Sequence, residues 1–436
     1  MEHFEALYPE NSREKELKEV ISLLKKGASA QVIGLPGVGR SNMLGFLPHN
    51  KTIRIHHLKE LEKWFHFVYM DFSEVKNRDL ADTIKFILIS ISYSLQEREF
   101  DAEAKKINDI LKNTVDLNDE LILFQSLKIA IDYLAIEKEL TVIFLFDRFD
   151  QYIPKVTEQF FINLKILRDH AKYRFGVVFS VSHPLEETVG PFILSTFYEF
   201  VGGNIVYLAL CDRPGLEFRI SYLEKTIQKT IDPKILKEIL LLTGGHSKVA
   251  LRACERVLSG EDITLQNLSS QLLASPHIQS ALYEIWIGLT PEEQLILQSK
   301  DGANNEKLKR LGLFSASGEN AIPLLMEFIS TLPKEKNALI LDPEKNDILL
   351  NKRTLSDDLS GSEFRLLRYL MQNEGRVCEK DEIIEAVWRE SATREGVTDQ
   401  ALDQIIYRLR KKIESNPNDP IFIKTVKGQG YRFSQE

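Results

Sequence analysis

Cysteine is scarce in this sequence: 436 residues contain three, at Cys211, Cys254 and Cys378. They are odd in number, far apart and without metal-ligand spacing, which excludes a disulfide-stapled scaffold and a thiolate metal site. This usage is typical of a reducing compartment.

Other features are also missing. The first residues, Met1 to Glu5, show no basic and apolar leader pattern, and no apolar run reaches the length of a transmembrane helix. We therefore expect a cytoplasmic protein with no membrane partner. The net charge of -8 excludes a protein that coats nucleic acid over its whole surface, so any DNA binding must be confined to a local basic element.

The length of 436 residues and the hydrophobic content of 43% are sufficient for about three domains with ample cores. The last hundred residues predict a helix over 359–370, a second over 381–388 and, after a loop over 389–397, a basic helix over 400–414. Ser360 can cap the first helix, and Thr398 or Asp399 can begin the third. Two β-prone runs around a Gly-Gln-Gly turn end the chain at 421–433. This order predicts a winged helix.

The segment from about 337 to 434 resembles the OmpR/PhoB-type effector domain of bacterial response regulators. The resemblance is carried by the motifs at 359–367, Ala386-Val-Trp388, Leu402-Asp403, 408–412 and Thr425-Val-Lys-Gly-Gln-Gly-Tyr431. It implies that the third helix enters the major groove of duplex DNA and the hairpin wing reaches the minor groove. The residues that would contact DNA are Gln400, Ala401, Gln404, Tyr407, Arg408, Arg410 and Lys411 on the helix, with Lys427 and Gln429 on the wing.

Side-chain chemistry favours some of these contacts. Arg408 and Arg410 can fork onto guanine edges or phosphates, and Gln404 can pair with adenine. The helix departs from the family at Gln400, Ala401 and Ile405, where Arg, Thr and His are common, and so loses polar contacts. Two alternatives stay open: a merely solvated basic face that includes Lys412, and a winged helix used for protein contact.

Near the other end of the chain, a short predicted strand over 29–33 runs into the glycine-rich segment 34–42 and a helical segment over 43–47. The spacing is that of the phosphate-binding loop G-x-x-x-x-G-K-[ST], with Arg40 in place of lysine. Backbone N–H groups of such a loop cradle phosphate, and Ser41 could bind magnesium. The cofactor-binding residues expected here are Gly34, Pro36, Gly37, Val38, Gly39, Arg40, Ser41 and Asn42, for ATP or ADP with Mg²⁺.

An apolar run over 141–147 ends in Asp147, as does a buried parallel strand that delivers a carboxylate to a metal. Further strands are expected over 65–71 and 174–183, and their alternation with helices predicts a parallel sheet covered on both faces. The order resembles a P-loop ATPase of the AAA+/STAND type, which places Ser182 or His183 near the sensor position. A helical segment over 212–260 resembles the lid of such ATPases and brings His246 toward the nucleotide.

The segment 279–332 resembles the small winged-helix domain that follows such lids, with Thr290, Pro291 and Glu293 forming a capping box. The expected domains are therefore 1–211 (P-loop α/β domain), 212–262 (lid), 263–332 (regulatory winged helix) and 338–436 (DNA-binding winged helix), with a linker at 333–337.

The departures at Arg40 and at Arg148, where hydrolytic relatives place an acid, leave Asp147 and Asp150 as the catalytic candidates. We expect nucleotide binding with slow hydrolysis at most. The resulting interpretation is a nucleotide-responsive transcriptional regulator that binds double-stranded DNA, with a homo-oligomer and a protein trigger left open as partners. The alternatives are an active STAND ATPase in signalling or phage defence whose winged helices contact proteins, and a loop that has lost its ligand.

Overall fold

The computed structural model describes residues 3–114, 116–259, 263–299, 305–315, 317–332, 339–342, 347–350, 353–355, 358–388, 399–414, 417 and 420–435. Its contacts divide the chain into two compact units, Met1–Thr331 (unit 1) and Leu332–Glu436 (unit 2). The predicted linker at 333–337 and the loop at 389–397 lie outside the described residues. The finer domain boundaries after residues 211 and 262 stay predictions.

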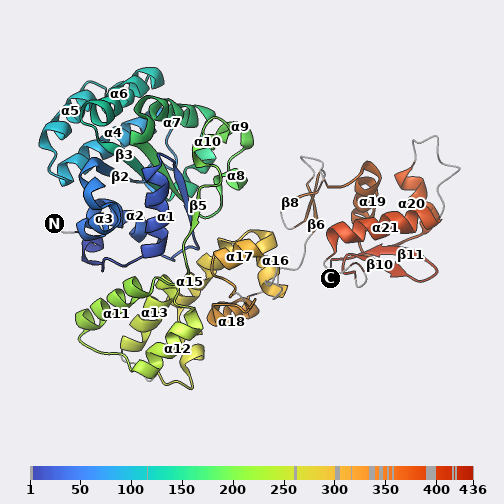
Figure 1. Cartoon of the computed structure of the whole chain (residues 1–436). Helices are drawn as coiled ribbons and strands as arrows, with labels where there is room; N and C mark the ends of the chain where they lie inside the picture. Colours follow the sequence, from blue (N-terminus) through green and yellow to red (C-terminus); the bar gives the residue numbers. More distant parts are fainter. Residues whose placement is uncertain are drawn as a thin grey trace. The chain divides into compact units, whose positions relative to one another are not determined.

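Unit 1, drawn in blue to orange in Figure 1, is built on a five-stranded parallel sheet. Its strand order is β2-β3-β4-β1-β5. All residues of β1 and β4 are buried, because continuous apolar runs suit strands that are covered on both faces. The α/β fold class with a parallel sheet is confirmed. The strands are β1 (Ala30–Ile33), β2 (Phe65–Asp71), β3 (Thr141–Asp147), β4 (Phe175–Val181) and β5 (Ile205–Tyr207).

Two layers of helices cover this sheet. Helix α3 packs on both α1 and α2, and α4, α5, α6 and α7 form a second group. Right-handed crossovers between parallel strands place these groups on opposite faces. The helices are α1 (Glu14–Lys25), α2 (Arg40–His49), α3 (Lys51–Leu58), α4 (Leu80–Glu97), α5 (Asp101–Lys112), α6 (Glu120–Asp132) and α7 (Glu158–Ala171), with short α8 (Leu185–Thr188), α9 (Pro191–Leu194) and α10 (Tyr198–Val201).

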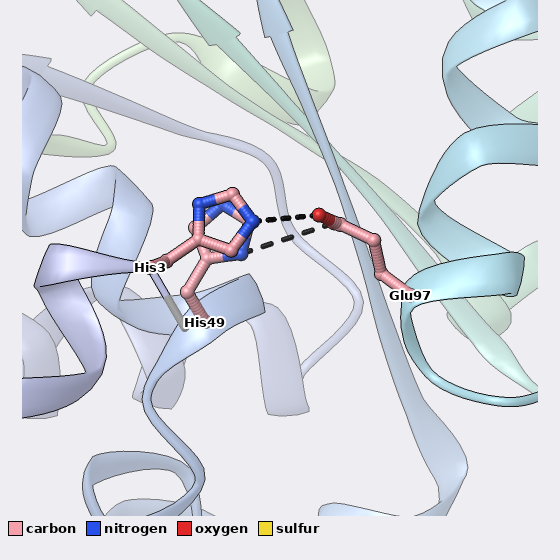
Figure 2. Close-up of side chains that lie close together, drawn as sticks. All are labelled: His3, His49 and Glu97. Atoms are coloured by element: carbon pink, nitrogen blue, oxygen red, sulfur yellow. Dashed lines mark hydrogen bonds and ion pairs between the residues drawn. The ribbon is translucent and has the colours of Figure 1, made fainter. Parts of the chain in front are cut away.

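The N-terminal segment is anchored to the α/β part. The 3-10 helix η1 (Phe4–Leu7) packs against α2. Just before it, His3 lies beside the last residues of α2 and α4, His49 and Glu97 (Figure 2).

The rest of unit 1 is helical. Helix α13 contacts α11, α12 and α15, and α18 contacts α12, α14 and α15, so these helices form one continuous bundle. In the described part of 263–331 the strand-like pairing consists of an isolated bridge between Phe314 and Asn320. The winged helix expected at 263–332 is therefore not confirmed. The helices are α11 (Arg213–Ile227), α12 (Pro233–Thr243), α13 (Ser247–Leu258), α14 (Leu268–Leu273), α15 (Pro276–Ile287), α16 (Pro291–Ser299), α17 (Glu306–Arg310) and α18 (Pro323–Thr331).

Unit 2 has its own hydrophobic core. Two antiparallel sheets, β6-β7-β8 and β10-β11-β9, accompany three helices. Ser360 caps the start of α19, as the sequence predicts, and Glu363 completes a capping box with it. The elements are β6 (Leu339–Asp342), β7 (Asp347–Leu350), β8 (Arg353–Thr354), α19 (Gly361–Gln372), β9 (Val377–Cys378), α20 (Lys380–Val387), α21 (Asp399–Ile413), β10 (Ile423–Val426) and β11 (Gly430–Phe433).

Among the described residues, none of the helices combines the length and the apolar character needed to cross a bilayer.

Candidate functional site

The glycine-rich loop joins the carboxyl end of β1 to the start of α2, as the sequence predicts. Gly39 adopts φ +106°, a backbone conformation that favours glycine, and directly precedes Arg40 at the first position of α2. The first N–H groups of a helix have no partner inside it, so this end of α2 presents donors and a positive dipole end. That arrangement suits an anion such as phosphate.

The carbonyl groups of the loop are held by the helical part of unit 1. The N-cap residue and the first two residues of α13 supply three donors to three consecutive loop carbonyls: His246 Nε2 to Pro36 (3.0 Å), Lys248 N to Gly37 (3.1 Å) and Ser247 Oγ to Val38 (3.2 Å). Because these carbonyls accept hydrogen bonds from the start of α13, the loop is held in place by that helix.

His246 is fully buried in this contact. Its Nδ1 accepts from the Val249 N–H at 3.4 Å, so Nε2 carries the proton that is donated to Pro36. Burial lowers the pKa of His246 to about 4, which keeps the ring neutral at physiological pH. The structure thus brings His246 to the loop, as expected, but both of its ring nitrogens are bonded to protein groups.

Arg13 also holds the loop, and sequence reasoning missed it. Its guanidinium donates to the carbonyl of Val38 (2.6 Å), the carbonyl of Ala209 (2.6 Å) and Glu16 (3.0 Å). The Arg13 side chain is buried, and the backbone N–H of Arg13 donates to the Asp212 carboxylate. Two of these partners are backbone carbonyls far along the chain, so no local pattern identifies the residue.

Asp147 ends β3 and is 1% exposed. The Tyr69 hydroxyl donates to its Oδ2 at 2.7 Å, while its Oδ1 is buried without a hydrogen-bond partner. Burial and the Asp147 carboxylate raise the pKa of Tyr69, which therefore stays a donor. A buried carboxylate oxygen that lacks a donor is chemically suited to a cation or a metal-bound water, so the residues fit a magnesium ion.

Arg40, at the position where the motif has lysine, is paired with Asp150. Its guanidinium lies 3.3 Å from Asp150 Oδ2, and the Ser182 N–H and hydroxyl donate to the same carboxylate at 2.8 and 3.2 Å. Arg148 turns away from this cluster to pair with Asp71 at 3.0 Å. Asp150, the expected substitute for the missing acid, is thus occupied by three donors.

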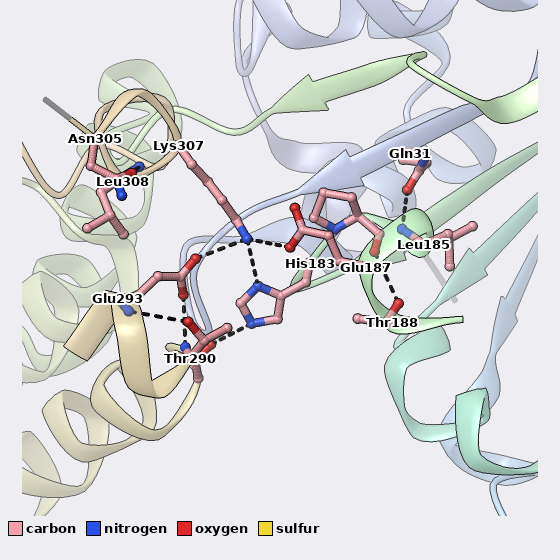
Figure 3. Close-up of polar contacts among 12 residues, drawn as sticks. Gln31, His183, Leu185, Glu187, Thr188, Thr290, Glu293, Asn305, Lys307 and Leu308 are labelled. Atoms are coloured by element: carbon pink, nitrogen blue, oxygen red, sulfur yellow. Dashed lines mark hydrogen bonds and ion pairs between the residues drawn. The ribbon is translucent and has the colours of Figure 1, made fainter. Parts of the chain in front are cut away.

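The segment after β4 is tied to the helical part of unit 1 through His183 (Figure 3). His183 Nε2 lies 3.0 Å from the Gly288 carbonyl and Nδ1 lies 3.4 Å from Lys307 Nζ. The Lys307 ammonium also contacts Glu187 at 2.7 Å and Glu293 at 3.0 Å. Ser182 and His183 therefore connect the Arg40 cluster to α8, α16 and α17.

A small cavity of about 30 Å³ adjoins the loop. It has room for a water molecule or two, so a purine base would require the surrounding side chains to move apart. Tyr8 lies in its wall, and its hydroxyl accepts from Asn42 and Arg219, both at 3.1 Å. The lining residues are Tyr8, Arg13, Val38, Gly39, Asn42, Phe46, Asp212, Gly215, Leu216, Arg219, Ser247 and Leu251.

In unit 2, α21 has one apolar and one polar face. Leu402, Ile405, Ile406, Leu409 and Ile413 are buried in the core. The opposite face is exposed, and Lys411 Nζ lies 4.7 Å from the centre of the Tyr407 ring. The exposed residues include Gln400, Gln404, Tyr407, Arg408 and Lys411.

The surroundings of Arg410 differ from those expected for a side chain that contacts DNA. Its guanidinium donates to the Ile423 carbonyl at 2.7 and 3.0 Å and to the Thr425 hydroxyl at 2.8 Å. It therefore links α21 to β10, and partial burial lowers its pKa. Lys412 is similarly paired, with Glu363 at 2.7 Å.

The hairpin of β10 and β11 carries Lys427 and Gln429 in its exposed turn, where the sequence places them. The turn requires Gly430, because a Cβ atom there would lie 2.0 Å from the Cys378 carbonyl oxygen of β9. The basic helix and the hairpin expected for a winged helix are thus both present in unit 2.

Comparisons with known proteins identify unit 2. Residues 356–433 match the family model of the transcriptional regulatory protein C-terminal domain. The chain is 39% identical over 98 residues to the sensory transduction protein RegX3 of Mycobacterium bovis, covering 22% of this chain and 41% of that protein. It spans less than half the length of this relative.

Two solved structures are also similar to parts of this chain. The DNA-binding domain of RstA from Klebsiella pneumoniae, solved with the RstA box, is 30% identical with a TM-score of 0.20, and the match covers 22% of this chain and 92% of that domain. The match of residues 356–433 to the family model, together with the curated relative, shows that unit 2 is an OmpR/PhoB-type winged-helix domain. Cdc6p from Pyrobaculum aerophilum matches over 74% of this chain and 81% of its own, at 16% identity and a TM-score of 0.34. Unit 1 has a P-loop fold on its own geometry, in which β1 of a parallel sheet runs through the glycine loop into α2.

Proposed function

We propose that this chain is a nucleotide-responsive transcriptional regulator, in which unit 2 binds double-stranded DNA and unit 1 binds ATP or ADP with Mg²⁺. The observation that carries the proposal is the exposed polar face of α21 in a domain that matches transcriptional regulators. A regulator of this kind acts on chromosomal DNA, so the proposal includes a cytoplasmic location.

The spacing of the exposed residues on α21 supports contact with one DNA groove. Gln400, Gln404, Tyr407, Arg408 and Lys411 recur at intervals of three and four residues, which places them along one side of a helix. Arg408 can pair with guanine and Gln404 with adenine, while Lys411 and the wing residues Lys427 and Gln429 suit phosphate. Arg410 supports this surface by holding the wing to the helix.

A salt-dependent selection with genomic fragments tests DNA binding. The full chain is expected to enrich a sequence class and to lose affinity steeply as salt rises, because phosphate contacts release counterions. Failure of the full chain and of residues 332–436 to bind any duplex at low salt would overturn this proposal and favour a protein-contact role for the winged helix.

For the nucleotide, the proposed phosphate cradle is the loop Gly34 to Gly39 with the first turn of α2. Ser41, at the start of α2, and Asp147, with its unpartnered Oδ1, are the proposed magnesium ligands. When bound, the ion would neutralise phosphate charge. Arg40 would contact phosphate after leaving Asp150, and Asn42 lies in the wall of the adjoining cavity. Ser182 would be linked to the nucleotide site through its hydrogen bonds to Asp150. His246 would hold the loop in place and would not contact the phosphate.

Hydrolysis is proposed to be slow. Fast phosphoryl transfer needs a group that positions the attacking water. Asp150 is bound by Arg40 and Ser182, and Arg148 is paired with Asp71. A carboxylate in that role would first have to break these contacts.

Calorimetry with ATP and with ADP, each with Mg²⁺, tests nucleotide binding. Asp147→Asn should weaken binding, whereas Asp71→Asn, at the end of the neighbouring strand, is the matched control. Absence of binding to the wild type would sink the nucleotide proposal. Phosphate release at about 1 per second or faster, abolished by Asp147→Asn, would instead show an active ATPase.

The partners beyond DNA and nucleotide are proposed by class. A regulator that switches with nucleotide needs an input signal. We therefore propose that another protein triggers the switch and that the chain forms a homo-oligomer. Sedimentation of the full chain with ADP and with ATP would show whether the assembly changes with nucleotide.

A further inference from the structure

Three potential metal ligands from three separate elements meet on one side of unit 1 (Figure 2). His3 precedes η1, His49 is the last residue of α2, and Glu97 is the last residue of α4. They lie outside the lining of the loop cavity and play no part in the proposed phosphate cradle.

The two imidazole rings are stacked, with centroids 3.6 Å apart and planes inclined by 12°. In Figure 2 both rings turn a nitrogen toward the Glu97 carboxylate. His3 Nε2 lies 2.7 Å from Oε1, and His49 Nδ1 lies 3.8 Å from Oε2. The candidate ligand atoms all lie within 4.8 Å of one another.

These separations are close to those of a zinc site. Bonds of about 2.0 to 2.2 Å in a tetrahedral site place neighbouring ligand atoms roughly 3.3 Å apart. Shifts on the order of 1 Å in side-chain position, together with a rotation of the two nearly parallel rings so that both lone pairs point to one place, would gather the three atoms around one ion. The His3 and Glu97 side chains are 41% and 23% exposed, so an ion and a fourth, water ligand can reach the site.

The donor set also suits a cation. Two imidazoles offer ring-nitrogen lone pairs, and one carboxylate adds a negative charge, so the cluster can bind a divalent ion.

We propose that His3, His49 and Glu97 form a binding site for a divalent transition-metal ion of the Zn²⁺ class. Two imidazoles and one carboxylate favour Zn²⁺, Cu²⁺ or Ni²⁺ over the hard ions Mg²⁺ and Ca²⁺, which prefer all-oxygen ligands. The site is separate from the magnesium site proposed at Ser41 and Asp147.

The position of the site gives the bound ion a structural consequence. It would join the N-terminal segment to the ends of α2 and α4, and Tyr8 of that segment lines the cavity beside the loop. Binding to the folded chain alone would raise its unfolding temperature. The alternative is a simple ion pair between His3 and Glu97 that binds no metal.

Calorimetry on the untagged, chelator-stripped full chain, titrated with ZnCl₂ in the absence of nucleotide, tests the proposal. One ion should bind per chain, with excess Mg²⁺ present as a competitor that has no effect. Removing a residue that only hydrogen-bonds to a metal ligand typically lowers metal affinity about 10- to 100-fold. Loss of a ligand itself should cost at least as much, so His49→Gln and Glu97→Gln should each weaken binding at least about tenfold.

The matched control is His170→Gln, which changes another histidine near a carboxylate, with His170 Nδ1 3.9 Å from Asp132 Oδ1. This variant should bind like the wild type. The exposed His3→Gln variant, checked by thermal unfolding, covers the case in which His49→Gln fails to fold. No binding to the wild type, or equal binding to all four variants, overturns the proposal. Since no nucleotide is present, either result is independent of the proposed function.

Discussion

Arg408 and Arg410 lie two positions apart on α21, yet their surroundings give them different roles. The Arg408 side chain is exposed on the polar face. The Arg410 guanidinium is bound to the Ile423 carbonyl and the Thr425 hydroxyl of β10. From the sequence alone, both residues are predicted to contact DNA, because both are long and flexible cations. The sequence does not show that a carbonyl on a strand 13 residues away accepts hydrogen bonds from one of them.

Substitution should separate the two residues. Arg408→Ala is expected to cost about 1 to 3 kcal/mol on the preferred DNA site and to change the free energy of unfolding by less than about 0.5 kcal/mol. Arg410→Ala should lower the free energy of unfolding by about 1 to 3 kcal/mol, because the partly buried Ile423 carbonyl and the Thr425 hydroxyl lose their charged donor. Anisotropy with matched and scrambled duplexes, together with urea unfolding, measures both effects. The assignment fails if Arg410→Ala leaves stability unchanged.

The Arg40–Asp150 pair gives a second prediction at this scale. Asp150→Asn keeps an acceptor for Ser182 but removes the charge that holds Arg40 at 3.3 Å. ATP affinity should rise by roughly three- to tenfold, because Arg40 is released and one negative charge is removed from the site. Asp71→Asn, which frees Arg148 instead, is the control for calorimetry. Weaker ATP binding by Asp150→Asn would argue that the pair is needed in the bound state.

At the scale of elements, the docking of the turn before α13 on the glycine loop depends on a neutral His246. The pKa of His246 is about 4 in the folded chain and about 6.5 when it is unfolded. The unfolded chain therefore takes up a proton first as the pH falls. The contribution of neutral His246 to the free energy of unfolding is present above pH 6.5 and is lost between pH 6.5 and about 4.

At pH 5 this difference corresponds to about 2 kcal/mol of lost stability from His246. His246→Gln, which can still donate to Pro36, should be less stable than the wild type at pH 7.5 and should lose less stability on acidification. Burial also lowers the pKa of His66, to about 3, so His66 likewise makes the folded chain less stable as the pH falls. The variant should therefore keep part of the pH dependence of stability. Urea unfolding at the two pH values measures the change. An unaltered pH slope in the variant would contradict the role of His246.

The wing gives a prediction of a different kind. Lys427 is exposed in the turn between β10 and β11 and is proposed to contact phosphate. Lys427→Ala should weaken binding to all duplexes alike and reduce the salt dependence by about one phosphate contact. Binding to specific and scrambled duplexes at several salt concentrations measures the slope. Loss confined to one sequence would mean that Lys427 reads bases.

Elements bounded by strong local patterns could be predicted from the sequence. The apolar runs that end in Asp71 and Asp147 give β2 and β3 with the observed bounds, and the Ser360 cap lies where its motif predicts. The winged helix expected at 263–332 is not confirmed, because capped helices alone do not specify a wing. Arg13 and the occupied state of Asp150 depend on partners far along the chain, which no local pattern reveals.

For the whole molecule, the proposed regulation requires that nucleotide binding in unit 1 changes DNA binding by unit 2. Each unit has its own core, so a substitution in one unit should leave the proposed function of the other intact. A coupling between two binding sites typically amounts to about 1 to 3 kcal/mol, or roughly a 5- to 150-fold change in affinity. It must also be reciprocal, so DNA should change nucleotide affinity by the same factor.

The most direct measurement is the affinity of the full chain for its selected duplex without nucleotide, with Mg²⁺-ADP and with Mg²⁺-ATP. We predict that at least one nucleotide changes the affinity about fivefold or more. Asp147→Asn should remove the change while retaining DNA binding, and Arg408→Ala should weaken DNA binding in every state. Equal affinity in all three states, with nucleotide binding confirmed by calorimetry on the same preparation, would contradict the account of a nucleotide-responsive regulator.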